Sequence, residues 1–266
     1  MSKKRNKLNR HDLHRGVYVL PNLVTAMNMF FGFYAIIAAT QGRFARAAIA
    51  VIVAGVFDNL DGKIARAFKS TSRFGVEFDS LSDLVSFGVA PAVLVYLWAL
   101  QGMGRLGWLA AFVFAACGAL RLARFNTQVG SVGIEHFVGL PIPGAAGMAM
   151  ATVLFYHRVG WYSPGQGGPL HPVVILAMLF TLAFLMVSTV PYESFKKSGV
   201  AKRKSFDVLV WMVLLVVAVA VEPYIGLFVV GAVYVSSGPV LLVIRHLRRH
   251  ARSSEVGDTE TTKTPL

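Results

Sequence analysis

Four aspartates lie close together in an otherwise apolar part of this chain. They form two pairs, Asp58 with Asp61 and Asp79 with Asp83. Residues three or four positions apart share a face of a helix, so the two members of each pair point the same way. A charged side chain at membrane depth is costly unless a polar cavity or a partner compensates it. The two pairs therefore indicate a functional site.

Four carboxylates at close range could not all stay ionised without a compensating positive charge. Mg²⁺ and Mn²⁺ prefer oxygen ligands, and paired metal ions commonly serve phosphoryl chemistry. We therefore expect two divalent ions, Mg²⁺ or Mn²⁺, at the aspartates. Gly62 leaves room for a ligand beside Asp61, Arg66 can contact phosphate, and Ser72 and Gly75 suit a turn over the ligand. The pattern predicts a site for a metal-bound phosphoanhydride.

Two other interpretations use the same acids. Arg66, Lys69 and Arg73 are near enough in sequence to pair with them as a surface cluster without a metal. A divalent-cation transporter would also need such ligands. Transporter sites usually lie near the bilayer midplane between repeated halves, whereas these acids occupy one hairpin with no counterpart in the C-terminal half. Four acids with a glycine near each pair favour the metal site of an enzyme.

Composition places this chain in a membrane. It has 266 residues, of which 55% are hydrophobic, and a mean hydropathy of +0.60. Lys and Arg number 26 against 13 Asp and Glu. These cations lie between apolar segments, which suits membrane topology and anionic lipid headgroups. No stacking platform or basic recognition helix is visible, so nucleic acid is not an expected partner.

A membrane helix needs about 20 mostly apolar residues. Eight segments meet this need: 20–40, 45–66, 76–100, 106–126, 140–157, 172–190, 207–221 and 224–245. The sequence therefore predicts an all-α polytopic membrane protein with about eight transmembrane helices. Its expected parts are a basic N-terminal segment (1–19), a transmembrane catalytic domain (20–245) and a polar, disordered cytoplasmic tail (246–266).

Basic residues indicate which side of the membrane each loop faces. If eight spans alternate from a cytoplasmic N-terminus, only Arg43, Arg46, Arg105 and Arg158 among the Lys and Arg residues fall on the opposite side. We therefore expect a multi-pass protein of a bacterial inner membrane with both termini in the cytoplasm. Both aspartate pairs then lie within about 12 Å of the cytoplasmic helix ends.

The aspartate region resembles the signature of the CDP-alcohol phosphatidyltransferase family at every position. The matching pattern is Asp58-x2-Asp61-Gly62-x2-Ala65-Arg66-x8-Gly75-x3-Asp79-x3-Asp83. The resemblance implies the helical fold of that family, with an active site facing the cytoplasm. All four aspartates would bind the two metal ions, and Asp83 would also deprotonate the acceptor hydroxyl.

The same resemblance implies a site for the CDP moiety of a nucleotide-linked lipid. Its expected residues are Asn22, Thr25, Gly62, Ala65, Arg66, Ser72 and Gly75.

Three further stretches resemble the phosphatidylserine synthase branch of the family. They are Leu20–Asn28, Cys117–Asn126 and Phe137–Ala146. The resemblance implies a homodimer that transfers a phosphatidyl group from CDP-diacylglycerol to the hydroxyl of L-serine, giving phosphatidylserine and CMP. The signature alone is shared with enzymes that use other alcohols, so glycerol 3-phosphate and inositol phosphate are alternative acceptors.

Arg121, Arg124 and Asn126 close the fourth predicted span on the cytoplasmic side, level with the aspartates. Arginines there can bind a lipid phosphate or the carboxylate of an amino-acid acceptor. We therefore expect these three residues to contact the acceptor. Ordinary anchoring of a span by cytoplasmic cations is the alternative for the arginines.

Overall fold

A computed structural model describes residues 10–68, 72–128, 139–161, 170–190, 192 and 221–260, and its regular elements in these ranges are all helices. In chain order they are α1 (Arg10–Thr40), α2 (Phe44–Phe68), α3 (Arg73–Asp83), η1 (Leu84–Val89), α4 (Ala90–Val95), η2 (Tyr96–Leu100), η3 (Gln101–Met103), α5 (Arg105–Gln128), α6 (Ile142–Val159), α7 (Leu170–Val187) and α9 (Pro223–Glu260).

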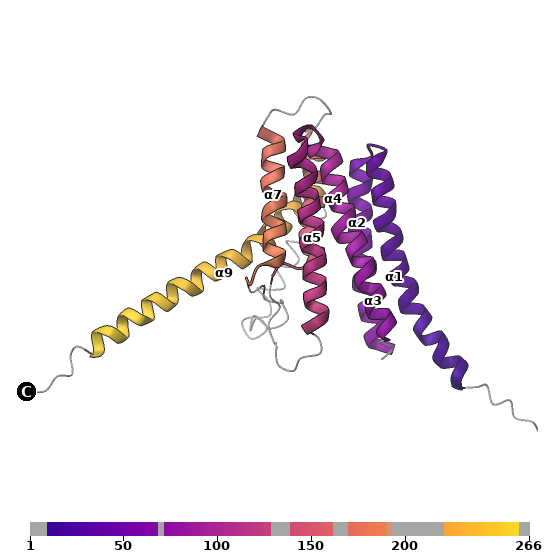
Figure 1. Cartoon of the computed structure of the whole chain (residues 1–266), viewed down its shortest axis with the longest axis horizontal. Coiled ribbons are helices and arrows are strands. Elements are labelled where there is room, and N and C mark those ends of the chain that lie inside the picture. The colour runs from indigo at the N-terminus through magenta and orange to yellow at the C-terminus, as the bar shows by residue number, and fades with distance from the viewer. Residues whose placement is uncertain are drawn as a thin grey trace, which may run out of the picture.

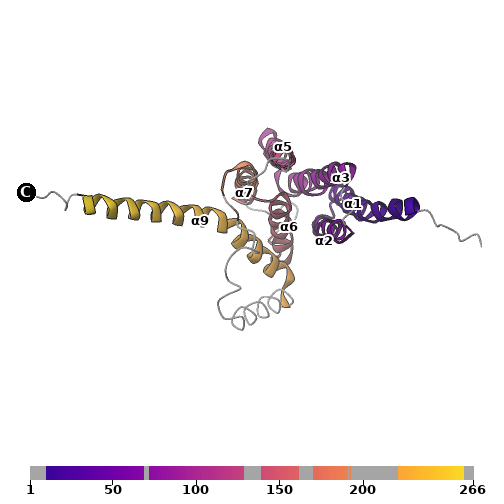
Figure 2. The same ribbon diagram turned by 90° about the horizontal axis from the view of Figure 1, so that it is seen from below.

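The helices from α1 to α7 form a bundle of roughly aligned rods, and α9 leaves it at an angle (Figure 1). The most extensive contacts join α1 with α2, α5 with α7 and α6 with α9. Seen from below, α1 lies beside both α2 and α3 (Figure 2). Because the aspartate pairs come from α2 and α3, α1 is the element that contacts both halves of the predicted site.

The membrane architecture predicted from the sequence is confirmed, but the count of eight spans is not. In the described part of the chain, four helices are long and apolar enough to cross a membrane. They are Leu20–Thr40, Arg73–Met103, Arg105–Thr127 and Pro223–Leu242. The helices α2, α6 and α7 coincide with three further predicted spans. The predicted span at 207–221 lies outside the described residues.

The last helix differs from the prediction in its length. The sequence predicts a span ending at 245 and a disordered tail after it, whereas α9 continues to Glu260. Neither glycine nor proline occurs between Pro239 and Gly257, and several strong helix formers follow Arg245. Residues 246–260 are therefore helical, and 261–266 lie outside the described residues.

The helix that carries the second aspartate pair contains a widened turn. Directly after Asp83, α3 passes into the π-helical η1, in which the Ala90 N–H donates to the Val85 carbonyl five residues earlier. Pro91 follows, and a proline has no N–H for the carbonyl four residues before it. Single π turns are frequent at functional sites in helices. This π-helical turn lies between Asp83, at the end of α3, and Pro91, near the start of α4.

Gly32 allows α1 to approach η1 closely. A Cβ atom on Gly32 would overlap Ser86. The Ser86 hydroxyl donates to the Asn28 carbonyl at 3.0 Å, which joins the two helices at this level. A larger side chain forced into such an interior typically costs about 1–3 kcal/mol. Gly32 therefore sets the distance between α1 and the helix that carries Asp83.

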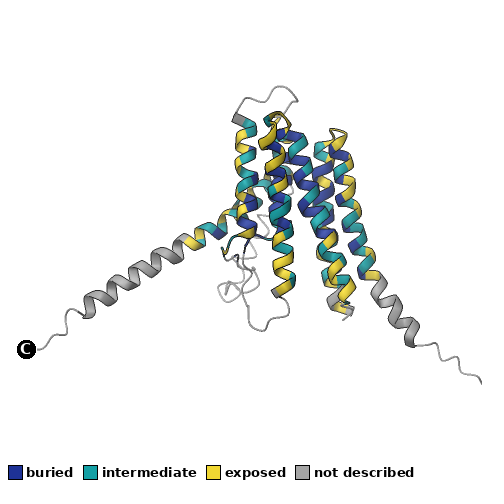
Figure 3. Ribbon diagram, in the orientation of Figure 1, coloured by how far each residue is buried: buried dark blue, intermediate teal, exposed yellow. Residues whose placement is uncertain are grey.

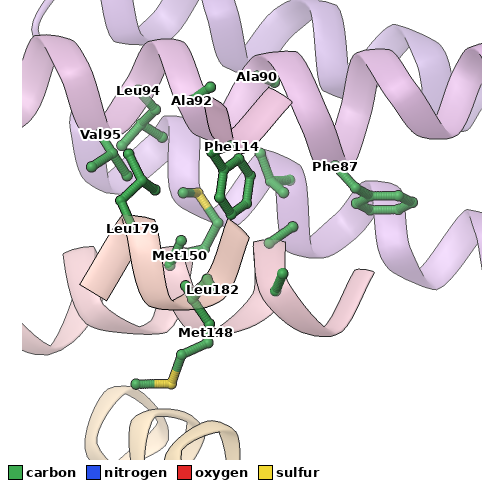
Figure 4. Packing of buried hydrophobic residues seen from close by; sticks show 14 of the residues in the cluster. Phe87, Ala90, Ala92, Leu94, Val95, Phe114, Met148, Met150, Leu179 and Leu182 are labelled. Carbon is green, nitrogen blue, oxygen red and sulfur yellow. The ribbon is translucent and has the colours of Figure 1, made fainter. Parts of the chain in front are cut away.

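Large apolar side chains fill the interior between the middle and later helices. Phe87, Leu94, Phe114 and Leu182 are almost fully buried and lie together (Figure 4). Buried residues concentrate within the bundle, and exposed ones on its outer surface and at helix ends (Figure 3). Outer residues such as Phe184 remain apolar. Since lipid tails are as apolar as these side chains, close packing rather than removal from water stabilises the bundle.

Candidate active site

Asp58, Asp61 and Asp79 converge in a geometry suited to a metal ion. One carboxylate oxygen from each lies within 4.8 Å of the other two. Oxygens bound to a common Mg²⁺ or Ca²⁺ are each about 2.0–2.6 Å from the ion, and so at most about 4–5 Å apart. The observed separations fit an ion placed between α2 and α3.

Asp83 adjoins this cluster and is more deeply buried. Its carboxylate accepts a hydrogen bond from Asn28 Nδ2 at 3.0 Å and lies within hydrogen-bonding reach of Asp58. Only 9% of Asp83 is exposed. The structure therefore brings together all four aspartates that the sequence singles out.

Within the described side chains, no ion pair joins a cation to these acids. Arg73 is exposed and forms no ion pair with them. The ion pair among the described side chains joins Arg158 to Glu222 at the far end of the bundle. Asp79 Oδ1 is buried without a hydrogen-bond partner among the described residues. A buried acceptor in this state is costly unless a cation or donor satisfies it. The donor set therefore fits a hard divalent cation.

Two polar side chains of α1 donate hydrogen bonds to the aspartates. Thr25 donates its hydroxyl to an Asp61 oxygen at 2.9 Å, with the Pro21 carbonyl at 3.1 Å as an alternative acceptor. Asn28, one turn further along, donates to Asp83. Both are buried. The resemblance implies that Thr25 touches the nucleotide, whereas the structure places its hydroxyl against a metal-ligand candidate.

Asn28 is a site residue that the sequence prediction missed. A usable signal was present, because Asn22, Thr25 and Asn28 repeat at every third position on one face of an apolar helix.

Three of the residues expected around the CDP moiety lie close together. Ser72 and Gly75 are at the start of α3, and Asn22 is on α1 next to them. The Gly75 N–H donates to Ser72 Oγ at 2.9 Å, which caps the helix. A Cβ atom on Gly75 would lie 3.1 Å from Ser72 Oγ and 3.3 Å from Asn22 Oδ1. Asn22, Ser72 and Gly75 therefore form one small wall.

The remaining expected CDP residues belong to α2. A Cβ atom on Gly62 would meet nothing within 4 Å, so open space lies beside Asp61. The side chains of Ala65 and Arg66 lie outside the described residues.

A cavity of about 200 Å³ opens beside Asp83. Its polar lining consists of Asp79, Ser80, Asp83, Arg121 and Asn126. Asn126 Nδ2 donates to Ser80 Oγ at 2.9 Å, and Arg121 Nε is buried without a partner among the described residues. The cavity thus has carboxylates on one wall and a guanidinium on another. Arg124, the third residue expected to contact the acceptor, is exposed and does not line it.

The support that Thr25 gives to Asp61 can be tested by metal binding. We expect Thr25→Val to weaken Mn²⁺ binding by about 10–100-fold, because outer partners of metal ligands typically contribute that much. Titration of the purified protein with Mn²⁺, followed by electron paramagnetic resonance, measures the change. Thr25→Ser keeps the hydroxyl and should bind as the wild type does. Unchanged affinity in Thr25→Val would show that the hydrogen bond does not organise the site.

Curated relatives match most of this chain. A CDP-diacylglycerol–serine O-phosphatidyltransferase of Helicobacter pylori is 35% identical over 216 residues, covering 80% of this chain and 89% of the relative. The enzyme of the same name from Mycobacterium tuberculosis is 30% identical over 255 residues, covering 92% and 85%. An archaetidylserine synthase of Methanothermobacter thermautotrophicus is 35% identical over 178 residues, covering 65% and 69%.

The model of the CDP-alcohol phosphatidyltransferase family matches residues 18–172. This range contains both aspartate pairs, the supporting face of α1 and the cavity beside Asp83. With the relatives above, the match confirms the resemblance seen in the sequence. The chain is a member of the CDP-alcohol phosphatidyltransferase family.

Proposed function

We propose that this protein transfers a phosphatidyl group from CDP-diacylglycerol to the hydroxyl of L-serine, releasing phosphatidylserine and CMP. One observation carries the choice of acceptor: Asp83 and Arg121 face the same small cavity at the edge of the aspartate cluster. The names of the relatives support it, since both the phosphatidyl and the archaetidyl enzymes are named for serine.

The four aspartates are proposed to hold two divalent ions, Mg²⁺ or Mn²⁺. When bound, these ions would neutralise the pyrophosphate oxygens of the CDP-lipid and the departing CMP. The wall formed by Asn22, Ser72 and Gly75, together with the open space at Gly62, leaves room for the CDP moiety beside the ions. Ala65 and Arg66 are proposed to complete this site.

Asp83 is proposed as the general base. Its carboxylate faces the cavity and is held in place by Asn28. It accepts the hydroxyl proton of serine while the serine oxygen forms a bond to the phosphorus that carries diacylglycerol. The bond from that phosphorus to the CMP oxygen breaks, and CMP leaves with the electron pair. A base must lie within hydrogen-bond reach of the proton that it takes, which the cavity allows.

Arg121 is proposed to bind the carboxylate of serine. A guanidinium can donate two parallel hydrogen bonds to a carboxylate, and this one has a buried nitrogen without a described partner. Asn126 and Ser80 would then lie on the other side of the acceptor. Serine is the smallest of the three candidate acceptors, so a cavity of about 200 Å³ favours it over inositol phosphate. Arg124 is proposed as a cation that anchors the span.

The acyl chains are proposed to lie in a groove between α2, α6 and α9. This groove of about 480 Å³ has an almost wholly apolar lining and ends at Asn59 and Lys63, next to the aspartates along α2. Gly144 and Gly147 line it from α6, where larger residues would narrow it. A lipid seated there would place its phosphate beside the metal site.

We also infer a location in a bacterial inner membrane with both termini in the cytoplasm. The uneven distribution of basic residues supports this orientation. A homodimer is proposed on the family resemblance.

An acceptor screen tests the proposed reaction. Purified protein given CDP-diacylglycerol, Mn²⁺ and labelled serine should release CMP and form labelled phosphatidylserine. Glycerol 3-phosphate and inositol phosphate should give much less product under the same conditions. Turnover with either of these but not with serine would assign another acceptor. Metal flux into liposomes without turnover of any CDP-lipid would instead indicate a transporter.

Two arginines on α5 give a matched test of the acceptor site. We expect Arg121→Ala to raise the KM for serine by about tenfold or more, because a hydrogen-bonded charge contributes about 1.5–3 kcal/mol. The KM for CDP-diacylglycerol should change little. Arg124→Ala removes an exposed arginine three residues later and should leave both constants near the wild-type values. Steady-state kinetics with each substrate varied in turn measures these effects. A larger effect at Arg124 would contradict the assignment.

A further inference from the structure

A second cavity, with two arginines in its lining, lies at the opposite end of the bundle from the aspartates. Its volume is about 480 Å³, and it is formed by the turn between α1 and α2, the start of α2, η2 and α6. Arg43, which precedes α2, lines it. Asp58 follows Arg43 by fifteen residues in the numbering, which along a helix is about 22 Å. This cavity is therefore separate from the catalytic site.

The ionisable side chains that line this cavity are two arginines and a histidine. Arg43 lines it from just before α2, Arg46 from the first turn of α2, and His157 from α6. No acidic residue lines it. Glu222, the acid described nearest this end, is held by Arg158 through hydrogen bonds of 2.7 and 3.1 Å. Within the described side chains, neither arginine of the cavity has a carboxylate partner.

Membrane topology does not account for these arginines. The positive-inside rule disfavours cations on this side, and only four Lys or Arg residues are predicted to lie there. Two of those four line one cavity. Arginines gathered in this way match the bidentate geometry of phosphate oxygens.

The position of the cavity indicates the kind of anion. Trp98 forms its inner wall and is packed against Tyr156 and His171, with ring centroids 5.6 and 5.3 Å away. Trp161, just beyond α6 at the same end, is exposed, and exposed aromatic residues at helix ends mark the headgroup level of a bilayer. A cavity of about 480 Å³ is also within the size range of sites for whole ligands rather than bare ions.

We propose that this cavity binds the phosphate of an anionic phospholipid in the leaflet opposite the aspartates. Arg43 and Arg46 contact the phosphate oxygens, His157 closes the α6 side, and the indole of Trp98 borders the glycerol. The site is independent of the transfer reaction, because its lining residues take no part in the aspartate site.

Native mass spectrometry in neutral detergent tests this site with defined lipids. The wild type should retain phosphatidylglycerol in preference to phosphatidylcholine. The double variant Arg43→Gln, Arg46→Gln should bind phosphatidylglycerol about tenfold or more weakly, since it loses charge-assisted hydrogen bonds to the phosphate. Arg105→Gln removes another arginine from the same face, outside the cavity, and should bind as the wild type does. Unchanged Mn²⁺ binding verifies that the double variant is folded.

A second variant keeps the test decisive if the double variant is unstable. Ala45→Glu puts a carboxylate into the cavity at the first turn of α2, where an acid stabilises a helix. It should also weaken phosphatidylglycerol binding. Equal binding of both lipids, or no loss in either variant, would overturn the proposal. Displacement of the lipid by millimolar inorganic phosphate would assign the cavity to free phosphate and overturn the lipid assignment.

Discussion

Repulsion among four carboxylates, two buried and two half-buried, is the constraint on which the structure around the site depends. At the observed separations of up to 4.8 Å, two unit charges repel each other by about 3 kcal/mol at an effective dielectric constant of 20. A hydrogen bond to a charged group returns about 1.5–3 kcal/mol. The bonds from Thr25 and Asn28 cannot offset the repulsion of every pair. Divalent cations can, and the arrangement is consistent with a protein built to bind them.

The first helix is the frame for this arrangement. α1 contacts both α2 and α3 and supplies a donor to one aspartate of each. α1 approaches η1 closely at Gly32, and Ser86 donates a hydrogen bond to the Asn28 carbonyl. These two contacts position Asn28 beside Asp83. The widened turn of η1 begins just after that aspartate. An apolar helix near the N-terminus thereby acts as part of the active site.

The sequence predicts much of this because spacing along a helix determines which side chains share a face. The aspartate pairs, the family and the helical membrane fold follow from such spacing. Contacts between helices do not, so the sequence does not predict that Asn28 and Thr25 donate hydrogen bonds to the aspartates. Arg121 and Arg124 are three residues apart, and helix periodicity cannot decide which of them enters the cavity. The sequence underestimates the length of α9, because the polar composition after residue 245 is typical of disorder.

The central claim is that Asp58, Asp61, Asp79 and Asp83 together bind the metal ions at which the CDP-lipid reacts. Anomalous diffraction at the manganese edge, from crystals grown with Mn²⁺ and CDP-diacylglycerol, tests it most directly. Two peaks enclosed by the four carboxylates, beside the pyrophosphate, are the predicted result. Manganese bound elsewhere, or a pyrophosphate that lies away from the aspartates, would contradict it.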